Sequence, residues 1–139
     1  MEQTDTRKAY LLINIIFAGV ILFIMGYSFF YSPYEDKYPV VCIHEKLTGE
    51  KCPSCGMSHA FSLIVRGKVD EALLWNSYSL RVFMFFSVQL VIRILLGAWC
   101  LFKDHKIRLI SRIDAGVSAV MTLAAFYPFL RMIWLTAML

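Results

Sequence analysis

The residues of this chain best suited to chemistry are three cysteines that lie close together in the sequence. Cys42 comes first, and Cys52 and Cys55 follow with Pro-Ser between them. His59 comes one helical turn after Cys55. Thiolates and imidazole nitrogens are ligands that zinc prefers, and three Cys with one His complete a tetrahedral set. Two cysteines three residues apart can also cycle between dithiol and disulfide.

Three interpretations of this cluster stay open at the level of sequence. The first is a structural disulfide from Cys42 to Cys52 or Cys55, which suits an oxidising compartment. The second is a metal site, with zinc as the candidate ion, formed by Cys42, Cys52, Cys55 and His59, or by His44 in place of His59. The third is a redox-active pair in which Cys52 attacks, Cys55 resolves and Cys42 relays.

A short helix is expected to position these side chains. The proline after Cys52 suits the first position of a helix, and Gly67 suits its end. The sequence therefore predicts a helix over residues 53–66 with Cys52 as its N-cap. Cys55 and His59 would share one face of that helix with Cys52, because they follow it at positions i+3 and i+7.

A second short helix is predicted over residues 71–76, with Asp70 as its cap and with Leu73, Leu74 and Trp75 carried to the membrane surface. Each helix has fewer than the roughly 20 residues that crossing a bilayer requires. We expect both to lie in the membrane interface, or to enter the bilayer and return.

The composition points to a membrane protein. Of the 139 residues, 59% are hydrophobic and 17% are charged, whereas soluble domains are about half apolar and about a quarter charged. The mean hydropathy of +0.63 agrees. These values exclude a disordered chain. The net charge of +4 comes from scattered basic residues, which argues against nucleic-acid binding.

Three long apolar stretches predict the fold class. They cover residues 10–31, 80–102 and 115–139, and each is long enough to cross a bilayer as a helix. The expected fold is an all-α integral membrane protein, a single domain. It consists of three transmembrane helices, with one or two interfacial or re-entrant helices between the first and second spans. The Cys-bearing segment covers residues 32–79, and a short loop covers residues 103–114.

The distribution of basic residues predicts the orientation. The loop carries four of them close together: Lys103, Lys106, Arg108 and Arg112. Loops dense in Lys and Arg stay in the cytoplasm. We therefore expect a cytoplasmic N-terminus, a cytoplasmic loop and an extracytoplasmic Cys segment.

Two arginines lie inside the predicted spans. An unpaired arginine at mid-bilayer costs at least about 2.5–3.5 kcal/mol. The predicted spans contain no Asp or Glu, so Arg93 is expected to find Gln89, backbone carbonyls, a partner chain or an anion such as a lipid phosphate. Arg131 lies nearer the end of its span and can extend toward water. A structural role and an anion or lipid contact both stay open.

The Cys segment resembles the bacterial membrane-protein family DUF2752. The resemblance covers residues 42–80 and rests on an ordered string: Cys42, Leu47-Thr48-Gly49, Cys52-Pro53-x-Cys55-Gly56-Met57-Ser58-x-Ala60, Arg66-Gly67-Lys68, Ala72 and Asn76. That family commonly has arginine where this chain has His59 and threonine where it has Ser58. The resemblance implies a small multi-pass bacterial membrane protein and no established activity.

Three functions are compatible with these patterns. The first is a non-enzymatic envelope component or accessory subunit, with a membrane partner or a second copy of itself, whose Cys segment is held by a disulfide or a metal ion. The second is a membrane thiol-disulfide oxidoreductase that uses Cys52 and Cys55. The third is anion or lipid handling through Arg93 and Arg131. A non-enzymatic role is favoured, because no Ser-His-Asp triad or carboxylate pair can be placed on the sequence.

Overall fold

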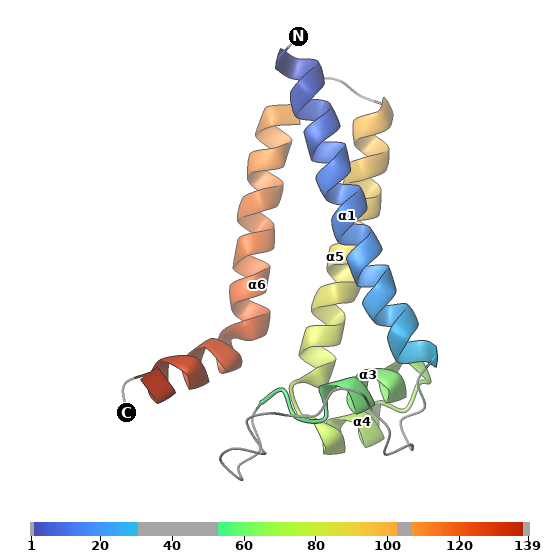
Figure 1. Ribbon diagram of the computed structural model, residues 1–139, viewed down its shortest axis with the longest axis vertical. Helices are drawn as coiled ribbons and strands as arrows, with labels where there is room; N and C mark the ends of the chain where they lie inside the picture. The colour runs from blue at the N-terminus through green and yellow to red at the C-terminus, as the bar shows by residue number, and fades with distance from the viewer. Residues whose placement is uncertain (1, 31–52, 103–106, 138–139) are drawn as a thin grey trace. The chain divides into compact units, whose positions relative to one another are not determined.

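The computed structural model describes residues 2–30, 53–102 and 107–137. Within that part the chain forms helices and no strand (Figure 1). The helices are α1 (Glu2–Phe30), α3 (Met57–Val65), α4 (Val69–Trp75), α5 (Ser79–Phe102) and α6 (Ile107–Ala137). The all-α fold class predicted from the sequence is confirmed.

Three of these helices are long and apolar enough to cross a membrane. They are Asp5–Phe30 of α1, Ser79–Phe102 of α5 and Ile107–Trp134 of α6. At about 1.5 Å per residue each exceeds the roughly 30 Å of a hydrocarbon core. Large apolar side chains along them are exposed, among them Phe23, Leu95 and Val120. Exposed apolar side chains suit a lipid environment. The predicted arrangement is confirmed to this extent: three candidate membrane-spanning helices, with two short helices between the first two among the residues that the structure describes.

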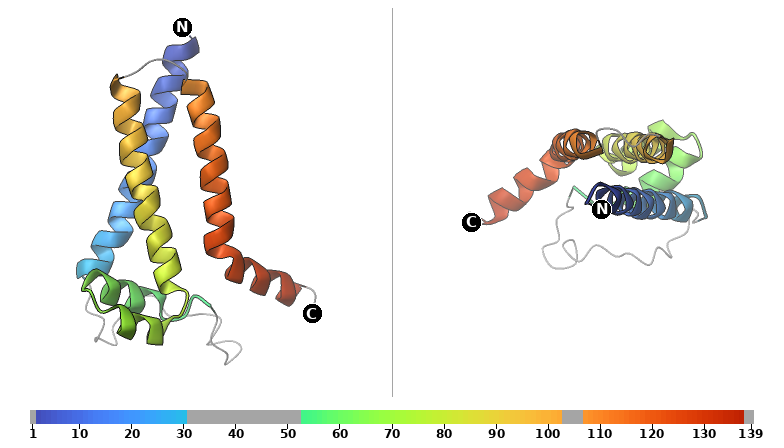
Figure 2. Two further views of the ribbon diagram at one scale, coloured as in Figure 1. Left: turned by 180° about the vertical axis from the view of Figure 1, so that it is seen from behind. Right: turned by 90° about the horizontal axis from the view of Figure 1, so that it is seen from above.

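The chain divides into two compact units, which we describe separately. Unit 1 comprises residues 1–23 and 84–125 and contains most of the three long helices. Unit 2 comprises residues 24–83 and 126–139. It holds α3 and α4, which lie side by side in each view (Figures 1 and 2) and form what we call the α3–α4 hairpin.

The start of α6 differs from the sequence expectation. The helix begins at Ile107, whereas the charges up to Asp114 suggested a loop that ended there. Asp114 is therefore part of a helix, and its side chain is buried. The sequence analysis places Asp114 in a solvated loop because it is charged. In the structure its charge is paired inside unit 1, as described below.

The start of α3 also differs. Residues 53–56 form a turn, and the helix begins at Met57 with Gly56 as its N-cap at a φ of 75°. The prediction that Cys52 caps a helix starting at the following proline is wrong. A glycine tolerates positive φ at no steric cost, and this allows the turn to precede the helix.

The end of α3 is confirmed. Gly67 has a φ of 78°, its N–H donates to Ile64 O at 2.9 Å, and the N–H of Lys68 donates to Leu63 O at 3.0 Å. This pair of bonds is a Schellman motif, which satisfies the last carbonyls of a helix. It reverses the chain within a few residues, so that α4 packs back on α3.

The hairpin has a small apolar core. Ala60, Leu63, Ile64 and Ala72 are buried together, with Phe83 of α5 packed against them. The first residue of α4 is Val69 and its N-cap is Lys68. Asp70 therefore lies in the first turn of α4, where the helix dipole stabilises its carboxylate. It is not the N-cap that the sequence suggested.

The two glycines that flank α3 provide a matched test of these turns. A Cβ on Gly67 would meet nothing within 4 Å, whereas a Cβ on Gly56 would lie 2.9 Å from Trp75 O. We expect Gly67→Ala to cost about 1 kcal/mol, the strain of a left-handed conformation, and Gly56→Ala to cost clearly more. Thermal unfolding in detergent measures the difference. Equal losses for the two variants would contradict the close approach at Gly56.

Candidate functional site

A buried ion pair lies at the centre of unit 1. The two terminal nitrogens of Arg93 donate to Asp114, Nη1 to Oδ2 and Nη2 to Oδ1, each at 2.6 Å. The side chains are 7% and 5% exposed. A two-pronged arginine–carboxylate pair is both short and directional. It joins α5 to α6 and places the two opposite charges in contact.

Four polar side chains complete this site, which we call the polar cluster together with Arg93 and Asp114: Tyr10, Asn14, Gln89 and Ser118. The Tyr10 hydroxyl donates to Asp114 Oδ2 at 2.9 Å. Arg93 donates further to Asn14 Oδ1 at 3.2 Å, to Gln89 Oε1 at 3.3 Å and to Ser118 Oγ at 2.6 Å. The cluster therefore draws on α1, α5 and α6.

The polar cluster neutralises itself. Arg93 lies about 14 Å along the helix from the end of α5, a distance that its side chain cannot easily bridge to reach water. The Asp114 carboxylate supplies the opposite charge, and three neutral acceptors supply further hydrogen bonds to the two terminal nitrogens. Polar side chains that bond across helices in this way hold a bundle together in lipid.

The sequence analysis identified Arg93 and Gln89 but missed Asp114. Gln89 is among the partners expected for Arg93. The acid was missed because it was assigned to the loop before the third span. The signal that could have found it is helical spacing, since Asp114 and Ser118 are four residues apart and share a face. Arg131 is exposed, and its contact with an anion or lipid stays a prediction.

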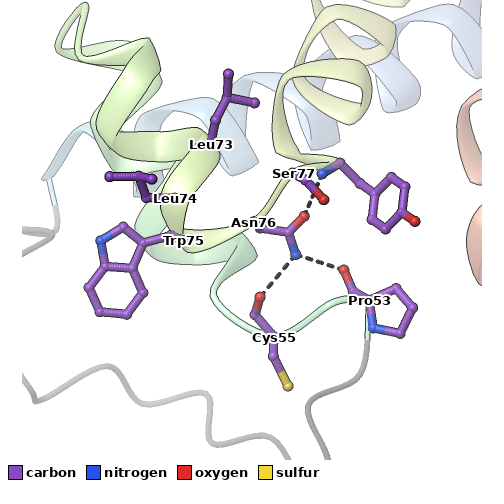
Figure 3. Close-up of a pocket in the computed structure, with 8 residues that line it drawn as sticks. Pro53, Cys55, Leu73, Leu74, Trp75, Asn76 and Ser77 are labelled. Carbon is purple, nitrogen blue, oxygen red and sulfur yellow. Dashed lines mark hydrogen bonds between the residues drawn. The ribbon is translucent and has the colours of Figure 1, made fainter.

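A second site lies in unit 2, at the turn formed by residues 53–56. The Asn76 side chain holds this turn: its Nδ2 donates to Pro53 O at 2.6 Å and to Cys55 O at 2.9 Å. Its Oδ1 accepts the N–H of Tyr78 at 2.8 Å. One buried amide thus ties the Cys turn to the connection between α4 and α5 (Figure 3).

The Cys55 thiol is set apart from these bonds. Its side chain is half-buried, and its sulfur points away from Asn76 (Figure 3). An open pocket of about 400 Å³ adjoins it, lined by Pro53, Cys55 and residues 73–78. Cys55 also directly precedes Gly56, the N-cap of α3.

His59 lies flat against Trp75, with ring centroids 4.4 Å apart and an angle of 6° between the rings. Cys55 lies outside α3, so the shared helical face expected for Cys55 and His59 is absent. No group of three metal-binding side chains occurs among residues 2–30, 53–102 and 107–137. Cys42, Cys52 and His44 lie outside the described residues, and the metal site stays a prediction.

Arg66 holds the other end of α3. It donates through Nη1 to Ser62 O at 2.8 Å and to the Ser62 hydroxyl. Its Nη2 donates to Phe29 O at 2.8 Å, in the last turn of α1. The last carbonyls of a helix have no partner within the helix, and the Arg66 guanidinium supplies one across the two elements.

The segment that contains the Cys turn and the α3–α4 hairpin is similar to a known family. Residues 42–90 match a family described as a protein of unknown function. This segment belongs to the DUF2752 family. The family predicted from the sequence is thereby confirmed, and its description assigns no activity. No curated protein and no solved structure matches the chain.

Five of the described residues on which the DUF2752 resemblance rests have structural tasks in the hairpin. Gly56 and Gly67 adopt positive φ, Ala72 is fully buried, and Arg66 and Asn76 satisfy backbone carbonyls. Sequence analysis assigned Gly67 to the end of the helix but gave Arg66 and Asn76 no task, because the carbonyls that these two side chains bind are far away in the chain. The string therefore specifies how the Cys turn is held.

The ion pair makes a clear prediction. Replacing only Arg93 with Met, or only Asp114 with Leu, leaves a buried charge without its partner, which typically costs about 3–5 kcal/mol. The double variant removes both charges, so we expect it to be more stable than either single variant. Thermal or SDS unfolding of the purified full chain measures this, and Arg131→Met serves as the exposed-arginine control with little effect. Additive losses in the double variant would argue against a direct pair.

The amide of Asn76 makes a second prediction. Asn76→Asp keeps the acceptor for the Tyr78 N–H but removes both donors to the Cys turn, at a cost of about 1–3 kcal/mol. We expect the released turn to expose Cys55 and to raise its alkylation rate, read by mass spectrometry of the peptide that carries it. Ser77→Ala, a change at the next residue, is the matched control and should leave the rate unchanged. An unaltered rate in Asn76→Asp would show that the amide does not hold the turn.

Proposed function

We propose that this chain is a non-enzymatic component of the bacterial cell envelope, an accessory subunit that presents a Cys-rich segment at the outer face of the inner membrane. The observation that carries the proposal is the polar cluster, in which Arg93 and Asp114 bind each other and the groups around them. Such a site stabilises a bundle. In the hairpin, Arg66 and Asn76 of the DUF2752 string likewise bind backbone carbonyls.

One contact supports the proposed orientation. Arg7, near the start of α1, donates to Leu101 O at the end of α5 at 2.9 Å. The start of α1 and the end of α5 therefore share one end of unit 1. Basic residues gather there, including Lys8, Arg108 and Arg112. By the positive-inside rule this end is cytoplasmic, and the segment that joins the first two spans is extracytoplasmic.

The accessory role requires that the Cys segment keep a stable shape outside the cell. A disulfide or a metal ion, with zinc as the candidate, would provide it, and both draw on Cys42, Cys52 and Cys55. For the metal, His59 is the proposed fourth ligand and would have to leave its stack on Trp75. This makes the disulfide the simpler of the two.

The second candidate is a membrane thiol-disulfide oxidoreductase. Its support is the position of Cys55, half-buried beside a pocket and just before a helix N-terminus. Anion or lipid handling is less favoured, since the Arg93 guanidinium already binds a carboxylate and only Arg131 is exposed to act on an anion.

Two measurements separate these functions. For the accessory subunit we expect purified, unreduced protein to show no catalytic oxidation of a dithiol substrate in the presence of a quinone, and Cys55→Ser to change nothing in that assay. Turnover that Cys55→Ser abolishes would establish the oxidoreductase instead. Thiol titration before and after reduction, with elemental analysis for zinc, decides between a bridge and a metal.

The orientation has its own test. An impermeant maleimide applied to intact, pre-reduced cells should label Cys55, because the turn that carries it faces outward. Cys100 is the internal control for folding, since it is buried and should be labelled only after SDS unfolds the protein. Labelling of Cys55 that requires the cells to be opened would invert the topology and remove the envelope proposal.

A further inference from the structure

Helix α4 changes character along its length. Its first turn is charged, with an exposed ion pair between Lys68 Nζ and Glu71 Oε1 at 3.0 Å. Its last turn is apolar and carries three large side chains in succession, which are 38%, 89% and 53% exposed: Leu73, Leu74 and Trp75. Water favours the first turn and an apolar medium favours the last.

The hairpin is attached at the ends of two membrane spans. Arg66 binds the carbonyls of the last turn of α1, including Phe29 O, and α1 ends one residue later. After Trp75 the chain enters α5 at Ser79. Both attachment points are ends of helices that are long and apolar enough to span a bilayer. The apolar turn of α4 is thus held near a membrane surface.

The exposed side chains there are of the kind that a bilayer interface accommodates. Phe29 and Phe30 are exposed in the last turn of α1, and Tyr78 is exposed just before α5. Amphipathic rings such as Trp and Tyr favour the level of the lipid headgroups. This surface is continuous along the chain with the lipid-facing surfaces of α1 and α5.

We propose that the last turn of α4 and Tyr78 bind the interfacial layer of the bilayer, where headgroups meet acyl chains. The charged first turn of α4 remains in water. The same residues line the pocket beside Cys55, so this pocket opens toward lipid and accepts the apolar part of a membrane amphiphile. The inference needs only that the chain spans a membrane, and it holds whether or not the envelope role does.

Tryptophan fluorescence tests the proposal. Replacing Trp99 and Trp134 with Phe leaves Trp75 as the only indole of the full chain. In phosphatidylcholine vesicles we expect blue-shifted emission from Trp75. Lipids brominated near the headgroup should quench it more than lipids brominated at the chain ends or aqueous acrylamide. Strong quenching by acrylamide with none by bromine would place α4 in water and overturn the proposal. Protection from both quenchers would also overturn it, because a protein surface would then cover the turn.

Two single substitutions in α4 sharpen the result. Leu74→Gln removes the most exposed apolar side chain of the helix at little cost to folding, so we expect Trp75 to become shallower, with red-shifted emission and less quenching by bromine. Asp70→Asn changes the charged first turn and should leave both readings unchanged. If Leu74→Gln also changes nothing, Leu74 does not contact lipid and the proposal fails.

Discussion

A charge inside a bilayer must be paired, and the Arg93–Asp114 contact meets that requirement here. Neither α5 nor α6 could carry its charged residue in lipid alone without a cost of a few kcal/mol. Brought together, the two residues neutralise each other, and Tyr10, Asn14, Gln89 and Ser118 add further hydrogen bonds. Apolar side chains can therefore face outward along all three helices. Unit 1 thus has polar side chains in its interior and apolar side chains on its surface, which is the reverse of a soluble domain.

The α3–α4 hairpin obeys the same requirement through its backbone. Short helices and turns leave carbonyls without partners, and near a membrane these cannot rely fully on water. Arg66 satisfies the end of α1, and Asn76 satisfies the Cys turn. The two glycines allow the chain to turn sharply enough for these side chains to reach. Backbone hydrogen bonding thus accounts for Arg66 and Asn76 of the DUF2752 string, and Cys55 lies beside the pocket.

Site and surface are linked through α4. Trp75 stacks on His59, its carbonyl approaches Gly56, and its exposed face adjoins the pocket at Cys55. A change in the medium around the last turn of α4 therefore acts on the same residues that position the Cys turn.

The sequence alone determined the class of protein, because helices of sufficient apolar length have no stable alternative to a bilayer. It also determined the family and the end of α3, since Gly67 is a local signal. Only the tertiary structure decided the partner of Arg93, the start of α3 and the task of Asn76. Each of these depends on groups distant in the chain, and no periodicity or propensity indicates which carboxylate, carbonyl or ring will be the neighbour. Asp114 shows the reason most clearly. A charged residue is expected to be exposed to water unless folding places an opposite charge beside it.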